Sequence, residues 1–202
     1  MTESKGALRK AALLDAAEEV LVTKGNANAA MRDFAAAAGV RIGHLQHYFP
    51  TRADLIRAVL ERALGRSLQR LSKVTEVDLS PGATGRLDPS DSYRLLSALL
   101  QEHSDMADIR MHLEIWALAA SDEPAASALR GFYSQYAAHV RGLVQRGRPG
   151  LSEQEASAVA ATVVSLFEGA AVTRSDIAGM RTAQGDEAII RTAQWLIHEN
   201  SG

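Results

Sequence analysis

Residues 31–49 read MRDFAAAAGVRIGHLQHYF, a run of small residues followed directly by a cluster of polar ones. Met31, Phe34, Ala35 and Ala38 recur at the spacing of one helical face, and Gly39 is expected to end this helix. A second short helix of about two turns follows, with Val40, Leu45 and Tyr48 or Phe49 turned inward. Two short helices joined by a tight turn cross closely only where the contact positions are small. The alanines and Gly39 meet that condition, so the stretch predicts a helix-turn-helix.

The polar cluster lies at the start and on the outer face of the second helix of this motif. In a helix-turn-helix, that helix enters the major groove of DNA. Arginine pairs with guanine and glutamine with adenine through two hydrogen bonds. We therefore predict that Arg41, His44 and Gln46 contact bases. The alternative is an ordinary solvated helix face.

Five further residues are candidates for phosphate contacts. Thr51 and Arg52 open the next helix, whose exposed N-terminal amides attract phosphate, and Arg32 begins the first helix of the motif. The Tyr48 hydroxyl binds a phosphate or the ring packs inward, and His47 contacts a phosphate or packs against the protein. A metal site at His44 and His47 would need further ligands, and few acidic residues lie nearby.

The residues around the motif also read as helices. An apolar stripe at Leu13, Ala16, Ala17, Val20 and Leu21 predicts a helix that ends at Gly25. Thr51 and Asp54 have the spacing of a capping box, followed by Leu55, Val59 and Leu60 on an inner face. Residues 75–91, TEVDLSPGATGRLDPSD, lack any period and are predicted to be a linker.

Beyond the linker the chain is again helical in pattern. Five more helices are indicated, the eighth running from about Glu153 to Thr173, and alternating strand patterns are hard to find. The predicted fold is all-α with about nine helices. We expect a helix-turn-helix DNA-binding domain at 1–50, a connecting fourth helix at 51–74, and a helical ligand-binding and dimerisation domain at 75–202.

Composition narrows the class of protein. The chain of 202 residues contains no cysteine, which excludes disulfides and cysteine-bound zinc. We expect no apolar run long enough to cross a membrane and no signal peptide, hence a cytoplasmic protein. Residues 1–74 carry 12 Lys/Arg and 7 Asp/Glu, a net charge of +5, whereas residues 75–202 carry 10 and 17, a net charge of −7. A basic first third suggests contact with a polyanion, although a chance imbalance would look the same.

Aromatic and apolar residues of the C-terminal part are candidates to line a small-molecule pocket. They are Met106, Ile109, His112, Leu113, Trp116, Phe132, Tyr133 and Tyr136, and most such stripes are plain core. Glu114 and Glu168 each lie in an otherwise apolar helix. With Trp116 and the tyrosines they would suit a cation, but a surface-facing glutamate is as consistent with the sequence.

The last two predicted helices have apolar residues on more than one face. Val163, Val164, Leu166 and Phe167 are interrupted only by Ser165. A helix that is apolar on two sides needs a second partner. We therefore expect a homodimer with a four-helix interface.

The segments LLDAAEEVLVTKG and MRDFAAAAGVRIGHLQHYFPTRADLIRAVLE closely resemble the DNA-binding domain of TetR-family transcriptional regulators, over roughly residues 9–62. Residues 115–144 faintly resemble the branch that contains the betaine–choline regulator. His47 and Tyr48 match the family's HYF motif. This chain departs from the family at six positions. Arg41 replaces the usual Ser or Thr, Ile42 replaces Lys, His44 replaces Thr and Gln46 replaces Tyr. Ala29 and Ala30 replace a usual Thr-Ser pair. The departure puts family phosphate contacts at 29, 30 and 42 in question.

The resemblance implies a ligand-responsive transcriptional regulator, most often a repressor that a small molecule releases from a palindromic operator. We expect no enzyme activity and no cofactor, because no Gly-rich phosphate loop, nucleophile elbow or His-Glu metal pattern occurs in the sequence. The alternatives are an enzyme without these motifs or a helical interaction module that does not bind DNA.

Overall fold

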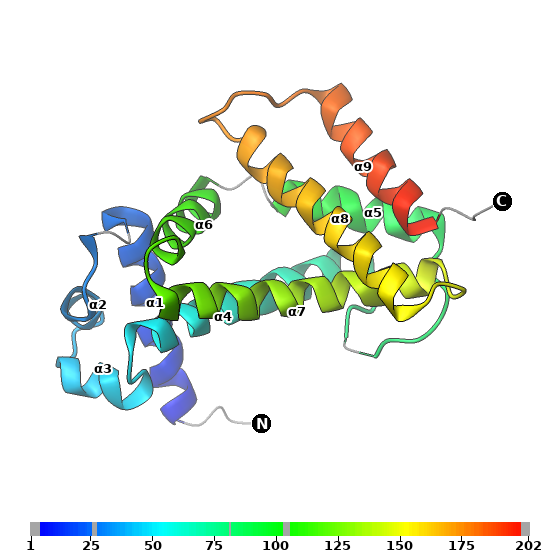
Figure 1. Cartoon of the computed structure of the whole chain (residues 1–202). Coiled ribbons are helices and arrows are strands. Elements are labelled where there is room, and N and C mark those ends of the chain that lie inside the picture. The colour runs from blue at the N-terminus through cyan, green and yellow to red at the C-terminus, as the bar shows by residue number, and fades with distance from the viewer. Residues whose placement is uncertain (1–4, 26–27, 81, 103–105, 199–202) are drawn as a thin grey trace. The chain divides into compact units, whose positions relative to one another are not determined.

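The structure is a computed structural model, and it describes residues 5–25, 28–80, 82–102 and 106–198, without the side chains of residues 106–108. In this part of the chain there are nine helices and no strand, which confirms the predicted all-α fold (Figure 1). The helices are α1 (Lys5–Lys24), α2 (Met31–Ala37), α3 (Ile42–Tyr48), α4 (Arg52–Thr75), α5 (Pro89–Glu102), α6 (Met106–Ala119), α7 (Glu123–Gly147), α8 (Glu153–Thr173) and α9 (Ala183–His198).

The residues group by their internal packing into two compact units. Unit 1 comprises Met1–Ala63 and Arg110–Phe132, and unit 2 comprises Leu64–Ile109 and Tyr133–Gly202. The helices α4, α6 and α7 therefore contribute to both units. The domain boundaries expected from the sequence, at residues 50 and 74, remain predictions.

The core of the first three helices forms from the apolar stripes seen in the sequence. In unit 1, α1 packs on α2, and α2 packs on α3. Leu13, Leu21, Phe34 and Leu45 are almost completely buried there. Burial of such side chains contributes about 1.5–3 kcal/mol each relative to exposure. The helix-turn-helix is thus held by contacts between sequence-distant residues as well as by its own turn.

The turn between α2 and α3 requires the glycine found there. Gly39 has a φ of 63°, a left-handed conformation that costs glycine little. Its N–H donates to the Ala36 carbonyl at 3.0 Å, and the N–H of Val40 donates to the Ala35 carbonyl at 2.9 Å. These bonds satisfy carbonyls at the end of α2 and fix the direction of α3.

The predicted capping box begins α4. The Asp54 carboxylate accepts the Thr51 N–H at 3.1 Å, and the Asp54 N–H donates to the Thr51 hydroxyl at 3.1 Å. The Thr51 hydroxyl also donates to the Asp54 carboxylate, at 2.7 Å, and this bond is the main cause that holds the pKa of Asp54 below its ordinary value. Leu55 and Ile56 are both fully buried one turn later, so the inner face is broader than the sequence pattern indicated.

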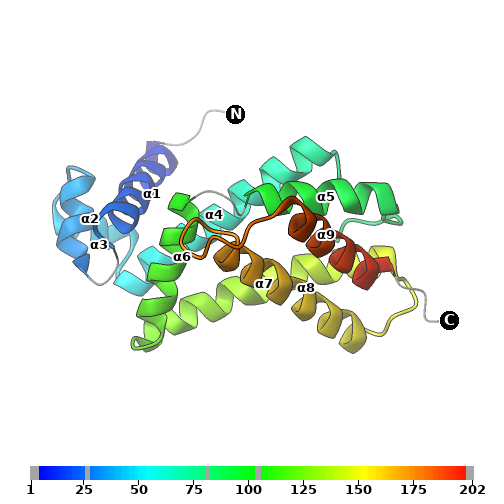
Figure 2. The same ribbon diagram turned by 90° about the horizontal axis from the view of Figure 1, so that it is seen from above.

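In unit 2, α9 packs against both α5 and α8 (Figure 2). Its buried residues Ile190, Ala193 and Ile197 follow the helical period predicted for the last helix. At its end α9 approaches α7 so closely that a Cβ on Gly147 would lie 2.6 Å from the Ile197 carbonyl oxygen. Only glycine fits at that position without a shift of α9.

A buried arginine joins three elements of unit 2. The side chain of Arg174, directly after α8, is 5% exposed. Its Nε and Nη2 donate to the Asp186 carboxylate at 2.6 and 2.9 Å, and its Nη1 donates to the Leu100 carbonyl at 2.9 Å. Arg181 also pairs with Asp186, at 3.4 Å. The hydrogen bonds from Arg174 hold the pKa of Asp186 below its ordinary value.

The segment between α4 and α5, predicted from the sequence to be a linker, is anchored to α7. Val77 and Leu87 are both buried. Arg146 of α7 donates from Nη1 to the Asp78 carbonyl at 2.7 Å and from Nε to the Gly85 carbonyl at 3.0 Å. Its own carbonyl accepts the Leu87 N–H at 3.1 Å. The segment therefore forms a fixed wall of unit 2.

One helix contradicts the expectation that no apolar run reaches membrane-spanning length. In length and composition α8 could cross a membrane. It also has the features of a core helix: Ser152 and Glu155 form a capping box, and Ala156, Ala160 and Phe167 are buried. The buried core helices of soluble proteins can have the same length and apolar composition, so we do not interpret α8 as a membrane span.

Candidate nucleic-acid interface

The buried side of α3 determines which residues face outward. Leu45 is fully buried, and Phe49, which follows the helix, is 2% exposed. The side chains of Arg41, His44 and Gln46 are exposed. This is the arrangement predicted from the sequence, in which the outer face of α3 is not covered by the described part of its own unit.

The side chains of Arg41 and Gln46 have no hydrogen bond, ion pair or ring contact with any residue that the structure describes. His44 is different, because its Nε2 accepts a weak bond from Arg9 Nε at 3.5 Å. Its ring also packs edge-on against Tyr48, with 5.5 Å between centroids. Arg41 and Gln46 therefore have all of their side-chain hydrogen-bonding groups left for base edges.

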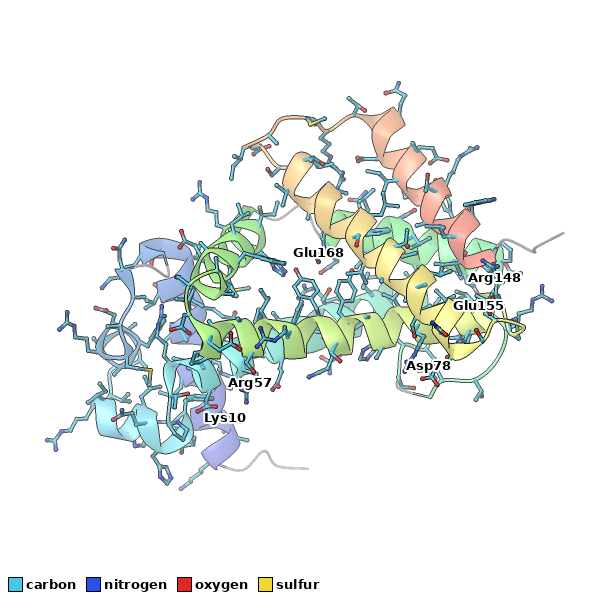
Figure 3. All side chains as sticks on the ribbon, viewed as in Figure 1. Lys10, Arg57, Asp78, Arg148, Glu155 and Glu168 are labelled. Carbon is cyan, nitrogen blue, oxygen red and sulfur yellow. The ribbon has the colours of Figure 1, made fainter. Side chains whose placement is uncertain are left out.

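At the end of α3, Tyr48 is half-buried, and the exposed His47 ring packs edge-on against it at 5.4 Å between centroids. Two cationic residues of α1 lie close to these residues and were missed in the sequence. Arg9 reaches His44, and Lys10 Nζ lies 5.6 Å from the centre of the Phe49 ring (Figure 3). The sequence signal was available, since Lys5, Arg9 and Lys10 form a basic cluster at the start of α1.

The predicted phosphate contacts differ in exposure. Arg32 and Thr51 are exposed at the starts of α2 and α4. Arg52 is half-buried, and burial lowers the pKa of its guanidinium while the Asp122 carboxylate opposes that shift. The phosphate roles of all three, like those of His47 and Tyr48, remain predictions.

The alanines at the start of α2 leave the helix with half of a capping box. Ala30 has no side-chain acceptor, but its N–H donates to the Asp33 carboxylate at 2.7 Å. That bond is the main cause that lowers the pKa of Asp33. The start of α2 therefore lacks a hydroxyl at residues 29 and 30 that could contact a phosphate.

The predicted ligand residues fall into two groups. In unit 1, His112 packs edge-on against the buried Phe132 at 5.8 Å between centroids, whereas Trp116 is 52% exposed. In unit 2, the Tyr133 hydroxyl donates to Glu168 at 2.7 Å. Ile109 and Tyr136 are buried there, and burial followed by the charge of Glu168 raises the pKa of Tyr136. The side chain of Met106 lies outside the described residues.

A cavity of about 370 Å³ lies in unit 2. Of the predicted ligand residues, Tyr136 lines it. The other lining residues were not predicted from the sequence. They come from α4, α5, α7, α8, the end of α9 and the segment between α4 and α5. Among them are Leu68, Leu71, Asp78, Leu79, Leu95, Leu96, Leu99, His139, Gly142, Leu143, Arg146 and Val163.

Comparison with known proteins identifies both parts of the chain. Residues 13–59 match the family described as bacterial regulatory proteins, tetR family, and residues 90–192 match the C-terminal domain of BetI-type transcriptional repressors. An uncharacterised HTH-type transcriptional regulator from Xanthobacter autotrophicus is 29% identical over 163 residues, covering 80% of this chain and 77% of the relative. Another from Mycobacterium tuberculosis is 26% identical over 169 residues, covering 81% of each.

Solved structures share the fold. A TetR transcription regulator from Haloarcula marismortui has a TM-score of 0.66 at 17% identity, covering 94% of this chain and 96% of the other. The multidrug binding protein EbrR, solved with imidazole, has a TM-score of 0.67 at 24% identity, covering 96% and 97%. The matching family and the curated relatives are transcriptional regulators rather than enzymes, as expected from the sequence. The chain belongs to the TetR family of bacterial transcriptional regulators, with a C-terminal domain of the BetI type.

Proposed function

We propose that this regulator is a repressor that binds a near-palindromic operator as a homodimer and leaves it when a small molecule binds. The observation that carries the DNA-binding part is the outer face of α3, where Arg41 and Gln46 are exposed above a buried Leu45 and have no bond to the described residues. Each such residue can read one base pair, with about 1–3 kcal/mol of discrimination. His44 is a third base contact once Arg9 turns toward a phosphate.

The phosphate contacts are assigned to Arg32, His47, Tyr48, Thr51 and Arg52. The exposed Thr51 at the start of α4 and the exposed Arg32 support this assignment. Contacts to phosphate position the protein and carry no sequence information themselves. Arg9 and Lys10 of α1 extend the same cationic surface.

The homodimer is proposed to form through the outer faces of α8 and α9. Trp195 is 57% exposed on α9, and Val172 is 45% exposed on α8. On the same face of α8 as Val172 lie small exposed residues, Ala161, Ser165 and Gly169. Large exposed apolar side chains beside small ones favour close helix packing against a second copy. A dimer would place two copies of α3 in successive major grooves, about 34 Å apart.

The small-molecule response is proposed to act through α4, which contributes residues to both units. A ligand that prefers one orientation of α4 changes the spacing of the two α3 helices. Operator affinity then falls by the factor with which the ligand binds this orientation more tightly than the DNA-bound one. EbrR, the similar structure described as a multidrug binding protein, supports a ligand-binding role. The residues first expected to contact ligand are Met106, Ile109, His112, Trp116, Phe132, Tyr133, Tyr136 and Glu168. A cytoplasmic location is part of this proposal, because the operator is there.

The test is the affinity of the purified protein for DNA that flanks its own gene, measured with and without candidate ligands. The proposal expects specific binding that a ligand of the protein weakens at least tenfold. Specific binding that remains unchanged when a demonstrated ligand is saturating would contradict the ligand response. Failure to bind any flanking DNA would contradict the repressor function itself.

A further inference from the structure

The cavity of about 370 Å³ in unit 2 is lined entirely by residues of that one compact unit and is partly open to solvent. Its volume is inside the range of about 300–1,000 Å³ that is typical of small-molecule sites. It is lined by the last turns of α7 and by the segment between α4 and α5. Apart from Tyr136, it does not coincide with the residues that the sequence suggested for a ligand.

The floor of the cavity is apolar. Leu95 and Leu96 of α5 and Val163 of α8 are buried, while Leu68, Leu99 and Leu143 are half-buried and retain surface toward open space. Contact with an apolar ligand would remove the remaining apolar surface of these half-buried leucines from water, which is favourable. The floor therefore suits the hydrocarbon body of a ligand.

The charged groups in the wall already have partners within the protein. Arg146 donates to the carbonyls of Asp78 and Gly85, and Arg141 pairs with Glu153 at 3.0 Å. The Asp78 carboxylate accepts the N–H and hydroxyl of Ser80 at 2.9 and 2.6 Å, which lowers its pKa (Figure 3). A charged ligand would have to compete with these bonds, so a neutral one is favoured.

His139 gives the wall a hydrogen-bond acceptor. Its Nδ1 lies 2.9 Å from the Gln135 carbonyl oxygen, one turn earlier in α7. Because a carbonyl only accepts, Nδ1 carries a proton, which leaves Nε2 as the ring nitrogen that can accept a hydrogen bond. A hydroxyl or N–H group on a ligand complements that lone pair.

We propose that this cavity binds a neutral, largely apolar molecule with one hydroxyl or N–H donor, which His139 Nε2 accepts. Binding itself does not depend on DNA recognition. Only the consequence, a change in operator affinity, rests on the proposed function.

The chain offers a matched pair of variants on α7. A Cβ on Gly142, which lines the cavity, would meet no other heavy atom within 4 Å, and the same is true of Gly131, which does not line it. Leucine favours helix more than glycine does, so neither Gly142→Leu nor Gly131→Leu should unfold the protein. Gly142→Leu takes up space in the cavity and Gly131→Leu does not.

The experiment titrates full-length protein with three compounds: 1-naphthol, 1-methoxynaphthalene, which lacks the donor, and 1-naphthoate, which is an anion. Binding is followed by calorimetry, with circular dichroism as the check on folding. We expect saturable binding of 1-naphthol, with 1-methoxynaphthalene and 1-naphthoate at least tenfold weaker. Gly142→Leu should lower the affinity for 1-naphthol at least tenfold, and Gly131→Leu should leave that affinity unchanged.

The variant His139→Phe tests the acceptor. It should remove the preference for 1-naphthol over 1-methoxynaphthalene while both still bind. Absence of saturable binding, equal binding of all three compounds, or equal effects of the two glycine variants would overturn the proposal. Operator affinity, measured separately, distinguishes the two claims: loss of DNA binding alone leaves the cavity proposal intact, and loss of compound binding alone leaves DNA recognition intact.

Discussion

The ion pair between Arg174 and Asp186 is predicted to be the most sensitive polar contact of unit 2. Removal of the carboxylate in Asp186→Ala leaves a guanidinium that is 5% exposed with one described acceptor, the Leu100 carbonyl. A buried charge that loses its partner destabilises a protein by roughly 3–5 kcal/mol. The opposite change, Arg174→Met, should cost less, about 1–3 kcal/mol, because Asp186 keeps Arg181 and access to water.

The double variant separates the energy of the pair from the cost of a stranded charge. With both charges removed, an apolar side chain fills the buried position, and such replacements are often neutral or stabilising. We therefore expect the double variant to be more stable than Asp186→Ala alone. Stability is measured by urea unfolding, followed by circular dichroism at one protein concentration so that dimer formation does not vary.

The neighbouring Glu187 provides the control. It pairs with Arg191 on the surface of α9, where the side chain of Arg191 is 74% exposed, and it accepts one exposed hydrogen bond from the Tyr93 hydroxyl at 2.7 Å. Surface pairs contribute little, so Glu187→Ala should shift the unfolding midpoint far less than Asp186→Ala. Equal shifts for the two variants, or a double variant as unstable as the sum of the single ones, would refute the reasoning.

The pH dependence of the pair has a definite sign. Hydrogen bonds from Arg174 lower the pKa of Asp186 in the folded protein. The stability that this carboxylate contributes is therefore fully present above about pH 4, the ordinary aspartate range, and is lost as the pH falls through the lowered folded pKa. The stability difference between wild type and Asp186→Ala should shrink below that range.

Three further predictions concern DNA binding and assembly. Gln46→Ala should relax base preference at one operator position by about 1–3 kcal/mol, measured with a set of single-base operator variants; equal weakening on every sequence would assign Gln46 to another role. Operator affinity should fall steeply with salt, with a log–log slope of about −0.9 for each phosphate contacted, and a flat salt titration would contradict a cationic interface. Trp195→Glu should convert dimer to monomer in light scattering, and a dimer that persists would move the interface away from α9.

Much of the helical architecture could be predicted because each helix carries a local apolar period. The ends of α1 and α2 follow from Gly25 and Gly39, and the start of α4 follows from Thr51 and Asp54. These signals lie within a few residues of the boundary that they set. The exposed face of α3 could be predicted for the same reason, since Leu45 determines which side is buried.

The missed features depend on contacts between distant parts of the chain. Nothing in the sequence around Leu87 indicates burial, and its position is set by Arg146 on α7. Arg174 has no local pattern that pairs it with Asp186, because the two lie on either side of an irregular segment. Trp116 was expected to line a pocket from its aromatic type; its side chain is half-exposed, and its contact with a ligand stays a prediction. A period shows which residues share a face, but not which partner covers that face.

The central claim is that two copies of α3 read one operator. The most direct measurement is a footprint on DNA that flanks the protein's own gene, with excess nonspecific DNA present and Arg41→Ala with Gln46→Ala as the comparison protein. The account predicts a protected segment with two related halves centred about one helical turn apart, and its loss in the double variant. A folded wild-type protein that protects no segment, or a double variant that protects the same segment equally well, would contradict it.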